Sequence, residues 1–222
     1  MSAPVPGPLT ARLKAMMDKR PAWYRDILAD LAVTLRATAA TRVLGPAAPM
    51  PDFVLPNAAG ELVASADLRG RGPLVVCFVR GGWCPFCNAT LEEIDAALPA
   101  IGAAGGSVVV LTPDMLGHAQ ATRRELGLRV ELLIDADCAV GLQFGTVYRV
   151  PDIYRAAVAS FGIDLVRRHG HGPGLLPMPA TFVCGPDGVL ILAQPSPDIT
   201  ERTEPSGLAA LVRRMATRDA GT

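Results

Sequence analysis

The amino-acid sequence predicts an α/β fold in which a central mixed sheet is flanked by helices. Apolar runs typical of buried strands occupy residues 74–79, 107–112 and 129–134, and segments with helical spacing separate them. This alternation is typical of parallel strands joined by right-handed crossovers. Two further apolar runs, at residues 181–184 and 189–192, are joined by a glycine-containing loop. That pattern predicts a hairpin, and therefore antiparallel strands as well.

The first 44 residues have a different pattern from the rest of the chain. Apolar residues recur at helical spacing between Leu9 and about Thr38, and Pro21 interrupts them, so two helices are expected. The next segment, residues 45–51, contains too much proline for a helix. We therefore expect a helical extension over residues 1–44 and one α/β domain over residues 45–222. The apolar stripe of the extension is expected to pack on that domain or on a partner subunit.

The remaining elements follow from the same kinds of signal. Two short strands, at residues 52–55 and 61–63, are expected around a turn. A helix at residues 116–126 is expected to end at Gly127. The other expected segments are a loop at 67–72, a short helix at 139–144, a helix at 152–161, a loop at 162–177 and a closing helix at 208–215.

Composition excludes several classes of protein. Lys plus Arg and Asp plus Glu both number 21 in 222 residues, so no basic surface for nucleic acid is expected. No apolar run approaches the roughly 18 residues of a membrane span, and the N-terminus lacks the apolar core of a signal peptide. Five cysteines are an odd number with no framework spacing. A reducing, cytoplasmic setting is therefore expected.

Two cysteines lie three residues apart where the strand at 74–79 gives way to a helix. The helix N-terminus offers unpaired N–H groups and the positive end of the helix dipole, and both favour a thiolate. Cysteines in such motifs have pKa values lowered from about 8.5 to roughly 3.5–7.5. Pro85 suits the first helical position, which places Cys84 at the cap and Cys87 one turn inside on the same face.

Three interpretations of Cys84 and Cys87 compete. A zinc site needs further ligands. Cys77, Cys138 and Cys184 show no Cys-x-x-Cys spacing, and His169 and His171 form an isolated pair. Inert structural cysteines are buried. Strand-to-helix turns are instead exposed at the C-terminal edge of the sheet, where the active sites of α/β proteins form. A Cys-x-x-Cys near a βαβ pattern is the thioredoxin-like redox signature. We therefore expect a redox pair, and no metal or cofactor.

The same stretch resembles a known family. Trp83-Cys84-Pro85-Phe86-Cys87 resembles the active site of thioredoxin folds, and residues 78–88 are similar to the peroxiredoxin-like branch of the alkyl hydroperoxide reductase and thiol-specific antioxidant (AhpC/TSA) family. Residues 48–56, 175–183 and 198–205 resemble the family's opening strand, a later strand and a C-terminal signature. The resemblance covers about residues 45–215 and implies a thioredoxin-like fold.

The resemblance also implies roles for single residues. Pro179 falls where thioredoxin folds carry a cis-proline, so a cis Met178–Pro179 bond beside Cys84 is expected. The arginine that most peroxiredoxins place before the later strand also falls on Pro179, so Arg80 is the candidate to supply that charge. Trp83 is expected either to shield the site and meet a reducing partner or to be a packed aromatic.

The family overlay and the thioredoxin analogy nominate different attacking cysteines. The peroxiredoxin pattern Pro-x-x-x-Thr-x-x-Cys puts Arg80 on the proline, Cys84 on the threonine and Cys87 on the peroxidatic cysteine. Thioredoxins instead attack with the first cysteine of the pair, here Cys84. Both routes end in a Cys84–Cys87 disulfide. Cap geometry favours Cys84 as the attacker.

The resemblance implies a thiol-dependent oxidoreductase that reduces peroxides, with a thioredoxin-like or low-molecular-weight thiol as reductant. One alternative is a thiol-disulfide reductase or isomerase, and another is a non-catalytic accessory protein that retains the fold. The N-terminal helices and the habit of the family favour a homodimer.

Three polar residues outside the motif have two interpretations each. Asp114 either bounds the site or caps a helix. Asp198 and Arg202 match the family signature, and we expect them to form an ion pair that anchors the C-terminal segment.

Overall fold

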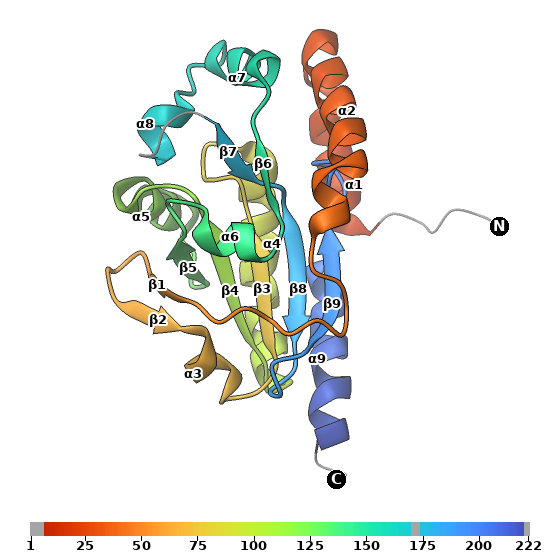
Figure 1. The fold of residues 1–222 in the computed structure, drawn as a ribbon, viewed down its shortest axis with the longest axis vertical. Coiled ribbons are helices and arrows are strands. Elements are labelled where there is room, and N and C mark those ends of the chain that lie inside the picture. The colour runs from red at the N-terminus through yellow and green to blue at the C-terminus, as the bar shows by residue number, and fades with distance from the viewer. Residues whose placement is uncertain (1–6, 170–173, 220–222) are drawn as a thin grey trace, which may run out of the picture.

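A five-stranded mixed sheet forms the centre of the protein (Figure 1). The computed structural model describes residues 7–169 and 174–219. The strand order is β5-β4-β3-β8-β9, in which β3, β4 and β5 are parallel and β8 and β9 are antiparallel to their neighbours. The strands are β3 (Leu74–Phe78), β4 (Ser107–Thr112), β5 (Glu131–Ile134), β8 (Ala180–Cys184) and β9 (Leu190–Pro195). The predicted α/β class with a central mixed sheet is confirmed.

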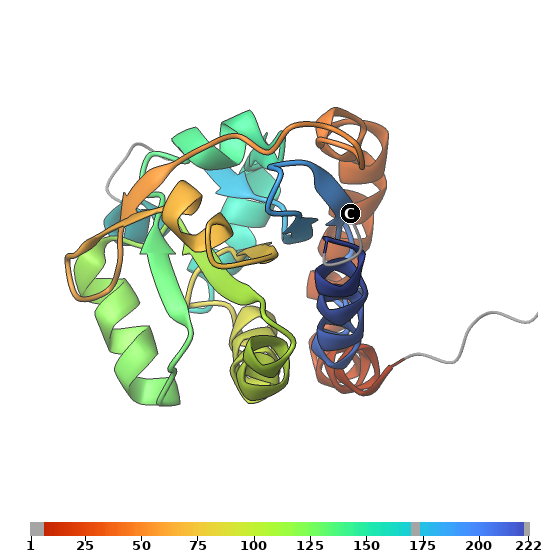
Figure 2. The same ribbon diagram turned by 90° about the horizontal axis from the view of Figure 1, so that it is seen from below.

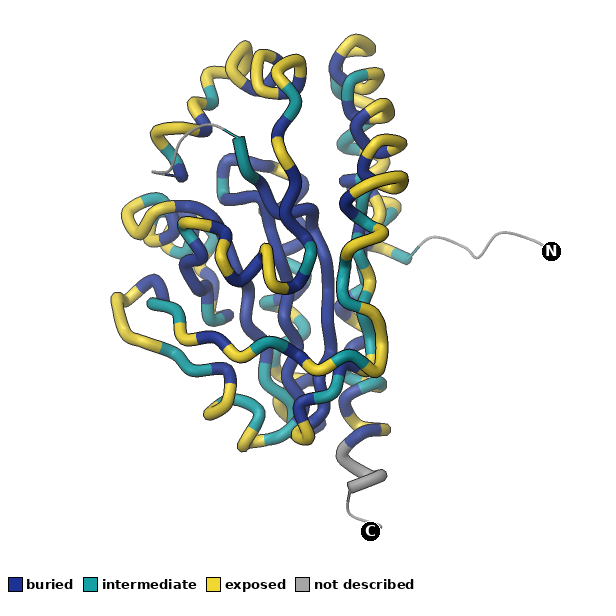
Figure 3. Tube along the Cα trace, viewed as in Figure 1, coloured by how far each residue is buried: buried dark blue, intermediate teal, exposed yellow. Residues whose placement is uncertain are grey.

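Both faces of this sheet are buried, as expected for parallel strands between two layers. Successive side chains of a strand point to opposite faces. Along β3, Val75 and Cys77 belong to one apolar core, whereas Leu74, Val76 and Phe78 belong to the other. Figure 3 shows the central strands as the buried interior, while the helices keep exposed outer faces.

Long helices cover one face of the sheet (Figure 2). They are α4 (Pro85–Ala103), α5 (Leu116–Leu126) and α9 (Pro205–Asp219). The helix α4 contributes Leu91, Ile94 and Ile101 to the core and contacts α9. Gly127 ends α5 in the left-handed conformation predicted for it. None of the helices in residues 7–169 and 174–219 is long and apolar enough to cross a membrane.

Short elements and an aromatic cluster cover the opposite face. Phe144 lies at the centre of the cluster, with ring centroids 5.1 Å from Phe78, 4.9 Å from Phe182 and 6.5 Å from Phe53. Such tilted and edge-on pairs each add about 0.5–1.5 kcal/mol beyond the area they bury. The elements on this side are β1 (Val54–Pro56), β2 (Leu62–Ala64), α3 (Ser65–Arg69) and α6 (Ala139–Gln143).

The N-terminal segment forms the two helices predicted on either side of Pro21. They are α1 (Pro8–Asp18) and α2 (Ala22–Ala37), followed by the 3-10 turn η1 (Ala39–Arg42). The helix α1 contacts α4, and α2 contacts α7 (Asp152–Ala159). The carboxylate of Glu204 accepts hydrogen bonds from the backbone N–H groups of Leu9 and Thr10, at 3.1 and 2.9 Å. The extension is thus tied to the start of α9.

Two sequence predictions of loops were incomplete. Residues 65–69 form the helix α3 where a loop was expected from residue 67. The expected loop at 162–177 contains α8 (Leu165–His169) and β7 (Leu175–Pro177), and β7 pairs with β6 (Val147–Arg149). These elements have three to five residues, too few for a periodic pattern to emerge. Residues 170–173, which include His171, lie outside the described part of the chain.

The contact between Glu204 and α1 gives a testable prediction. A carboxylate at a helix N-terminus satisfies orphan N–H groups and complements the helix dipole. We expect Glu204→Ala to lower the free energy of unfolding by about 1–2 kcal/mol. Chemical denaturation measures this loss. The matched control is Glu201→Ala, because Glu201 makes only an exposed ion pair with Arg36 at 3.3 Å and should lose less than about 0.5 kcal/mol. Equal losses in the two variants would contradict the capping role.

Candidate active site

The two cysteines lie at the junction of β3 and α4. Cys84 is the N-cap residue of α4, Pro85 occupies the first helical turn, and the backbone N–H of Cys87 points to the Cys84 sulfur at 3.4 Å. This is the cap geometry that the sequence predicted. Both cysteines are free thiols and both are buried, with Cys84 only 1% exposed. The sulfur atoms therefore meet the helix N-terminus with little competition from water.

Two glycines allow the preceding loop to approach its neighbours. Gly81 has φ of 121°, and a Cβ atom there would lie 2.7 Å from the Asp114 carboxylate. A Cβ atom at Gly82 would overlap with the Thr122 side chain on α5. The Gly81 conformation is one that residues with a side chain rarely adopt. Glycine at both positions thus sets the path of the loop into Cys84.

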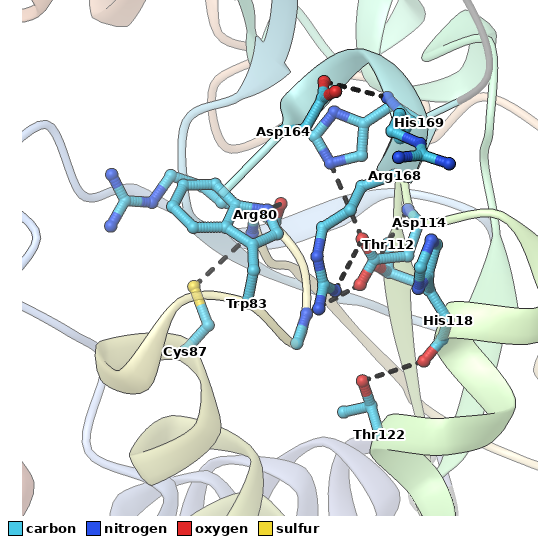
Figure 4. Close-up of polar contacts among 12 residues, drawn as sticks. Arg80, Trp83, Cys87, Thr112, Asp114, His118, Thr122, Asp164, Arg168 and His169 are labelled. Carbon is cyan, nitrogen blue, oxygen red and sulfur yellow. Dashed lines mark hydrogen bonds and ion pairs between the residues drawn. The ribbon is translucent and has the colours of Figure 1, made fainter. Parts of the chain in front are cut away.

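Asp114, which follows the neighbouring strand β4, binds this loop. Its carboxylate is buried and accepts a hydrogen bond from the backbone N–H of Gly82 at 2.7 Å. Arg168 and His169 converge on the other carboxylate oxygen, at 3.7 and 3.6 Å (Figure 4). The helix α5 begins after Met115 without a side-chain cap. Of the two interpretations of Asp114, the one that places it beside the site is correct.

Trp83 is a packed aromatic residue. Its side chain is only 8% exposed and donates a hydrogen bond from Nε1 to the carbonyl oxygen of Arg80 at 2.8 Å. The Arg80 guanidinium carbon lies 5.4 Å from the centre of the Trp83 ring. Trp83 therefore shields the loop. It leaves little ring surface for a reducing partner to contact.

Arg80 is a buried cation beside the pair. Its Nη2 donates a hydrogen bond to the Cys84 sulfur at 2.9 Å, and its Nη1 donates to the Tyr154 hydroxyl at 2.5 Å. Its backbone N–H points to the Cys87 sulfur at 3.5 Å. Burial alone lowers the pKa of Arg80, but the charges of Cys84, Tyr154, Cys87 and Tyr148 together outweigh burial, so the net pKa is raised. The guanidinium thus stays charged. The positive charge that Arg80 was expected to supply lies beside the Cys84 sulfur.

The two thiols differ in acidity. Burial by itself raises the pKa of Cys84, but a hydrogen bond from the Cys87 thiol and the charge of Arg80 outweigh it, so the net pKa lies well below the ordinary value. Burial also raises the pKa of Cys87, and there the Cys84 thiolate adds to the effect. A thiolate on Cys84 beside a protonated Cys87 is the state that these contacts favour.

Pro179 corrects one expectation. The described residues contain no cis peptide bond, so the predicted cis Met178–Pro179 bond is wrong. Hydrogen bonds of 2.8 Å hold both sides of this bond in an extended chain, from Met178 N–H to Thr146 and from Ser196 N–H to the Pro179 carbonyl. The β3–β8 register, extended by one residue, places Pro179 opposite Val79 at the edge where the cysteine loop begins. Its contact with Cys84 stays a prediction.

Arg202 differs from its predicted role. Its Nη1 donates to the backbone carbonyls of Glu201 and Asp198, at 2.8 and 3.2 Å, whereas the Asp198 carboxylate accepts from Thr200. The expected ion pair is therefore replaced by hydrogen bonds to the backbone. Burial lowers the pKa of Arg202, and the charge of Cys87 opposes that shift, so the two groups are close enough to interact electrostatically. The family signature at 198–205 was the signal that pointed to this residue.

Sequence reasoning missed three tyrosines around Arg80. Tyr154 accepts a hydrogen bond from Arg80. The charge of Arg80 also acts to lower the pKa of Tyr24 and of Tyr148. Burial raises the pKa of Tyr148 to about 12, with Arg80 acting in the opposite direction. In the sequence these residues resemble core aromatics on helical or strand patterns. Only their convergence in the fold relates them to the cysteines.

The other cysteines are unsuited to redox work. Burial raises the pKa of Cys77 and of Cys138 to about 12 and that of Cys184 to about 11. Cys138 occupies the N-cap position of α6. Across residues 7–169 and 174–219, no three His, Cys, Asp or Glu side chains gather as metal ligands. His169 is buried at the end of α8 beside Asp114.

Solved structures share this fold at low sequence identity. Peroxidoxin BcpB from Mycobacterium tuberculosis matches with a TM-score of 0.59 and 17% identity, over 79% of this chain and 97% of its own. Peroxiredoxin Q from Xanthomonas campestris matches with a TM-score of 0.54 and 19% identity, over 80% of this chain and 96% of its own. A "putative protein disulfide isomerase" from Bacteroides thetaiotaomicron matches with a TM-score of 0.55 and 16% identity, over 81% of this chain and 97% of its own. The arrangement of strands and helices is thus that of thioredoxin-like peroxiredoxin structures.

Sequence comparison identifies the family. The sequence profile of the AhpC/TSA family matches residues 46–193. The "Putative peroxiredoxin Rv2521" of Mycobacterium tuberculosis is 31% identical over 154 residues, which cover 69% of this chain and 87% of that protein. The match includes β3, the cysteine loop and α4, where the site geometry was found. The chain belongs to the AhpC/TSA family, the family of peroxiredoxin-like thiol oxidoreductases.

Proposed function

We propose that the protein reduces peroxides with Cys84 as the attacking thiolate and Cys87 as the resolving thiol. The observation that carries the proposal is the hydrogen bond of 2.9 Å from the buried Arg80 guanidinium to the Cys84 sulfur. A thiolate is the nucleophilic form of cysteine, and a neighbouring cation and a helix N-terminus both stabilise it. Family membership supplies the reaction class, and the geometry supports the assignment of roles.

The chemistry proceeds in two steps. The Cys84 thiolate attacks one oxygen of the hydroperoxide, the O–O bond breaks, and the departing oxygen takes up a proton to leave as water or alcohol. Cys84 is then a sulfenic acid. The Cys87 sulfur attacks the Cys84 sulfur, water leaves, and a Cys84–Cys87 disulfide forms. Cys87 lies one helical turn away, so the second step is nearly intramolecular.

The overlay on ordinary peroxiredoxins would assign these roles the other way round. Two observations favour Cys84. Arg80 directs its side-chain Nη2 at the Cys84 sulfur, whereas Cys87 receives only a backbone N–H from the same residue at 3.5 Å. The charge on Cys84 also keeps Cys87 protonated. The neutral thiol can then transfer its proton as it attacks the sulfenic acid.

Burial distinguishes peroxide from the alternative substrate, a protein disulfide. A protein disulfide must bring its sulfur into contact with the attacking sulfur, and Cys84 is 1% exposed. A hydroperoxide is small enough to reach a buried thiolate through modest fluctuations. The fold does not separate the two activities, since peroxiredoxins and a protein named as a disulfide isomerase share it.

The cellular setting belongs to the same proposal. An external dithiol, thioredoxin-like or of low molecular weight, reduces the Cys84–Cys87 disulfide, and the protein works in the cytoplasm as a homodimer. Residues 45–222 form the thioredoxin-like domain and residues 1–44 a helical extension; the family match from residue 46 supports that boundary. Arg80, Trp83 and Pro179 complete the site around the pair.

The proposed activity is tested with two substrates in one assay. Stopped-flow fluorescence measures oxidation of the reduced protein by hydrogen peroxide and by an organic hydroperoxide, with free cysteine as reference. We expect oxidation far faster than that of free cysteine. Turbidity in a parallel reaction measures reduction of insulin disulfides, which we expect to be slow. Slow peroxide oxidation with fast insulin reduction would establish the disulfide reductase instead.

Serine variants at the two cysteines separate the two roles. Cys84→Ser should consume little peroxide, because burial, the largest cause of the raised Cys87 pKa, still disfavours a thiolate on Cys87. Cys87→Ser should consume about one equivalent and stop as a sulfenic acid, because nothing resolves it. Dimedone labelling followed by mass spectrometry checks this product. Cys184→Ser, a change to a buried cysteine outside the site, is the control. Rapid peroxide consumption by Cys84→Ser would reverse the assignment.

The pH dependence of oxidation tests the role of Arg80. The folded pKa of Cys84 lies below the ordinary value, so the thiolate is present above that pKa and is lost as pH falls through it. The oxidation rate should therefore be flat near neutral pH and decline on acidification. Arg80→Gln should move the decline to higher pH by about one unit or more, which lowers the rate on the acidic slope about tenfold. Arg80→Lys, which keeps the charge, should shift it less. An unchanged profile in the folded Arg80→Gln variant would contradict the role.

A further inference from the structure

A chain of buried polar groups continues behind Arg80, away from the cysteines. Arg80 Nη2 contacts the Cys84 sulfur, and Nη1 on the same planar group donates to the Tyr154 hydroxyl at 2.5 Å. The guanidinium carbon also lies 5.8 Å from the centre of the Tyr154 ring. Because the guanidinium is rigid, fixing Nη1 also fixes the direction of Nη2. Tyr154 is therefore placed to orient the contact with Cys84.

Besides Cys84 and Tyr154, the guanidinium also has the Tyr148 hydroxyl as a neighbour, since a hydrogen bond with Arg80 opposes the rise in the pKa of Tyr148. Arg80 and Tyr154 are both buried, and the Nε of Arg80 makes no hydrogen bond within the described part of the chain. A buried charged donor that loses its partner carries the full cost of desolvation and turns toward another acceptor. Removal of the Tyr154 hydroxyl would thus release Nη1 and loosen the alignment of Nη2.

Tyr154 is in turn held by the N-terminal extension. Burial raises the pKa of Tyr24, whereas the charge of Arg80 and the hydroxyl of Tyr154 act in the opposite direction, so the Tyr24 and Tyr154 side chains are neighbours. Tyr24 lies on α2 and Tyr154 on α7, and these helices contact each other at one end of the molecule (Figure 1). Phe161 packs edge-on against Tyr24 at 5.1 Å.

A second contact from the extension reaches the cysteine helix. Arg20, in the connection between α1 and α2, lies with its guanidinium carbon 5.7 Å from the centre of the Phe86 ring. Phe86 stands between the two cysteines in the sequence. The extension thus packs over the start of α4 as well as against α7. Its place in the fold is beside the redox pair.

We propose that Tyr154, supported by Tyr24 of the N-terminal extension, is a positioning residue that holds the Arg80 guanidinium against the Cys84 sulfur. The extension then completes the redox site. This inference rests on the proposed role of Cys84, and through Tyr24 it extends the site to the N-terminal helices, outside the segment of the family match. The two tyrosines act through Arg80 and do not touch the reacting atoms.

Tyr154 acts as a neutral hydroxyl. Burial raises its pKa, with Arg80 opposing that shift, so the group remains protonated and its oxygen accepts from Nη1. The charged and titratable groups that surround Cys84 come from several elements. They are Arg80, Cys87 on α4, Tyr24 on α2, Tyr148 on β6, Tyr154 on α7 and Arg202 before α9.

The test measures the thiolate directly, without peroxide. Ultraviolet absorbance of the full-length reduced protein is followed from about pH 4 to about pH 8.5, below the range where tyrosine ionises. The same curve for Cys84→Ser is subtracted, which leaves the titration of Cys84. The variants are Tyr154→Phe and Tyr24→Phe. The matched control is Phe161→Leu, which disturbs packing at the same α2–α7 contact without removing a hydroxyl group.

We expect Tyr154→Phe to raise the midpoint by about one pH unit, equivalent to about a tenfold loss of thiolate at a given acidic pH. Tyr24→Phe should raise it by about half as much, because it acts through Tyr154. Phe161→Leu should leave the midpoint unchanged. Equal midpoints in Tyr154→Phe and Phe161→Leu would overturn the proposal, as would equal shifts in all three variants.

A second measurement guards against a folding defect. Far-ultraviolet circular dichroism and denaturation establish that each variant is folded before titration. If Tyr154→Phe does not fold, the Cys84 midpoint of Tyr24→Phe is compared with that of the control Phe161→Leu. A higher midpoint in Tyr24→Phe would support the proposal, and an equal midpoint would overturn it. The readout requires no turnover. Slow peroxide oxidation with a shifted midpoint would therefore reject the peroxidase function and leave the positioning role in place.

Discussion

The burial of one positive charge organises the site. A guanidinium away from water is costly unless its donors find acceptors and a negative charge lies nearby. Arg80 meets these conditions with the Cys84 sulfur on one nitrogen and the Tyr154 hydroxyl on another. The same contacts make a thiolate on Cys84 the favoured partner. The stability of the buried arginine and the reactivity of the cysteine therefore have a common origin.

This interaction depends on how the sheet and the loop are built. The apolar strand β3 leads to Arg80 at the carboxyl edge of the sheet. Cys84, four residues after Arg80, is the N-cap of the helix α4. Between them, Gly81 and Gly82 let the chain approach Asp114 and Thr122 closely. Asp114 fastens the loop from the next strand. A small shift in this loop would move Arg80 and Cys84 relative to each other.

The sequence was sufficient for features that depend on local signals. The strand, Pro85 at the start of α4 and the cap position of Cys84 all lie within a few neighbouring residues, and each agrees with the structure. The short elements α8 and β7 have no periodic pattern, although the Asp164 carboxylate accepts from Val166 and Arg167 N–H as a helix-start residue does. The partners of Arg80 could not be predicted, because they meet only through tertiary packing. The sequence around Pro179 likewise did not distinguish a trans bond from the cis bond that the resemblance implied.

The account makes Cys84 the thiolate and Cys87 the neutral thiol of the reduced protein, because Arg80 faces one sulfur with its side chain and the other only with its backbone. Nuclear magnetic resonance of protein labelled with ¹³C at the cysteine Cβ atoms measures each ionisation separately across a pH series. The predicted result is a Cys84 signal that titrates below neutral pH while the Cys87 signal stays that of a thiol. A Cys87 signal that titrates first, with Cys84 still protonated, would contradict it.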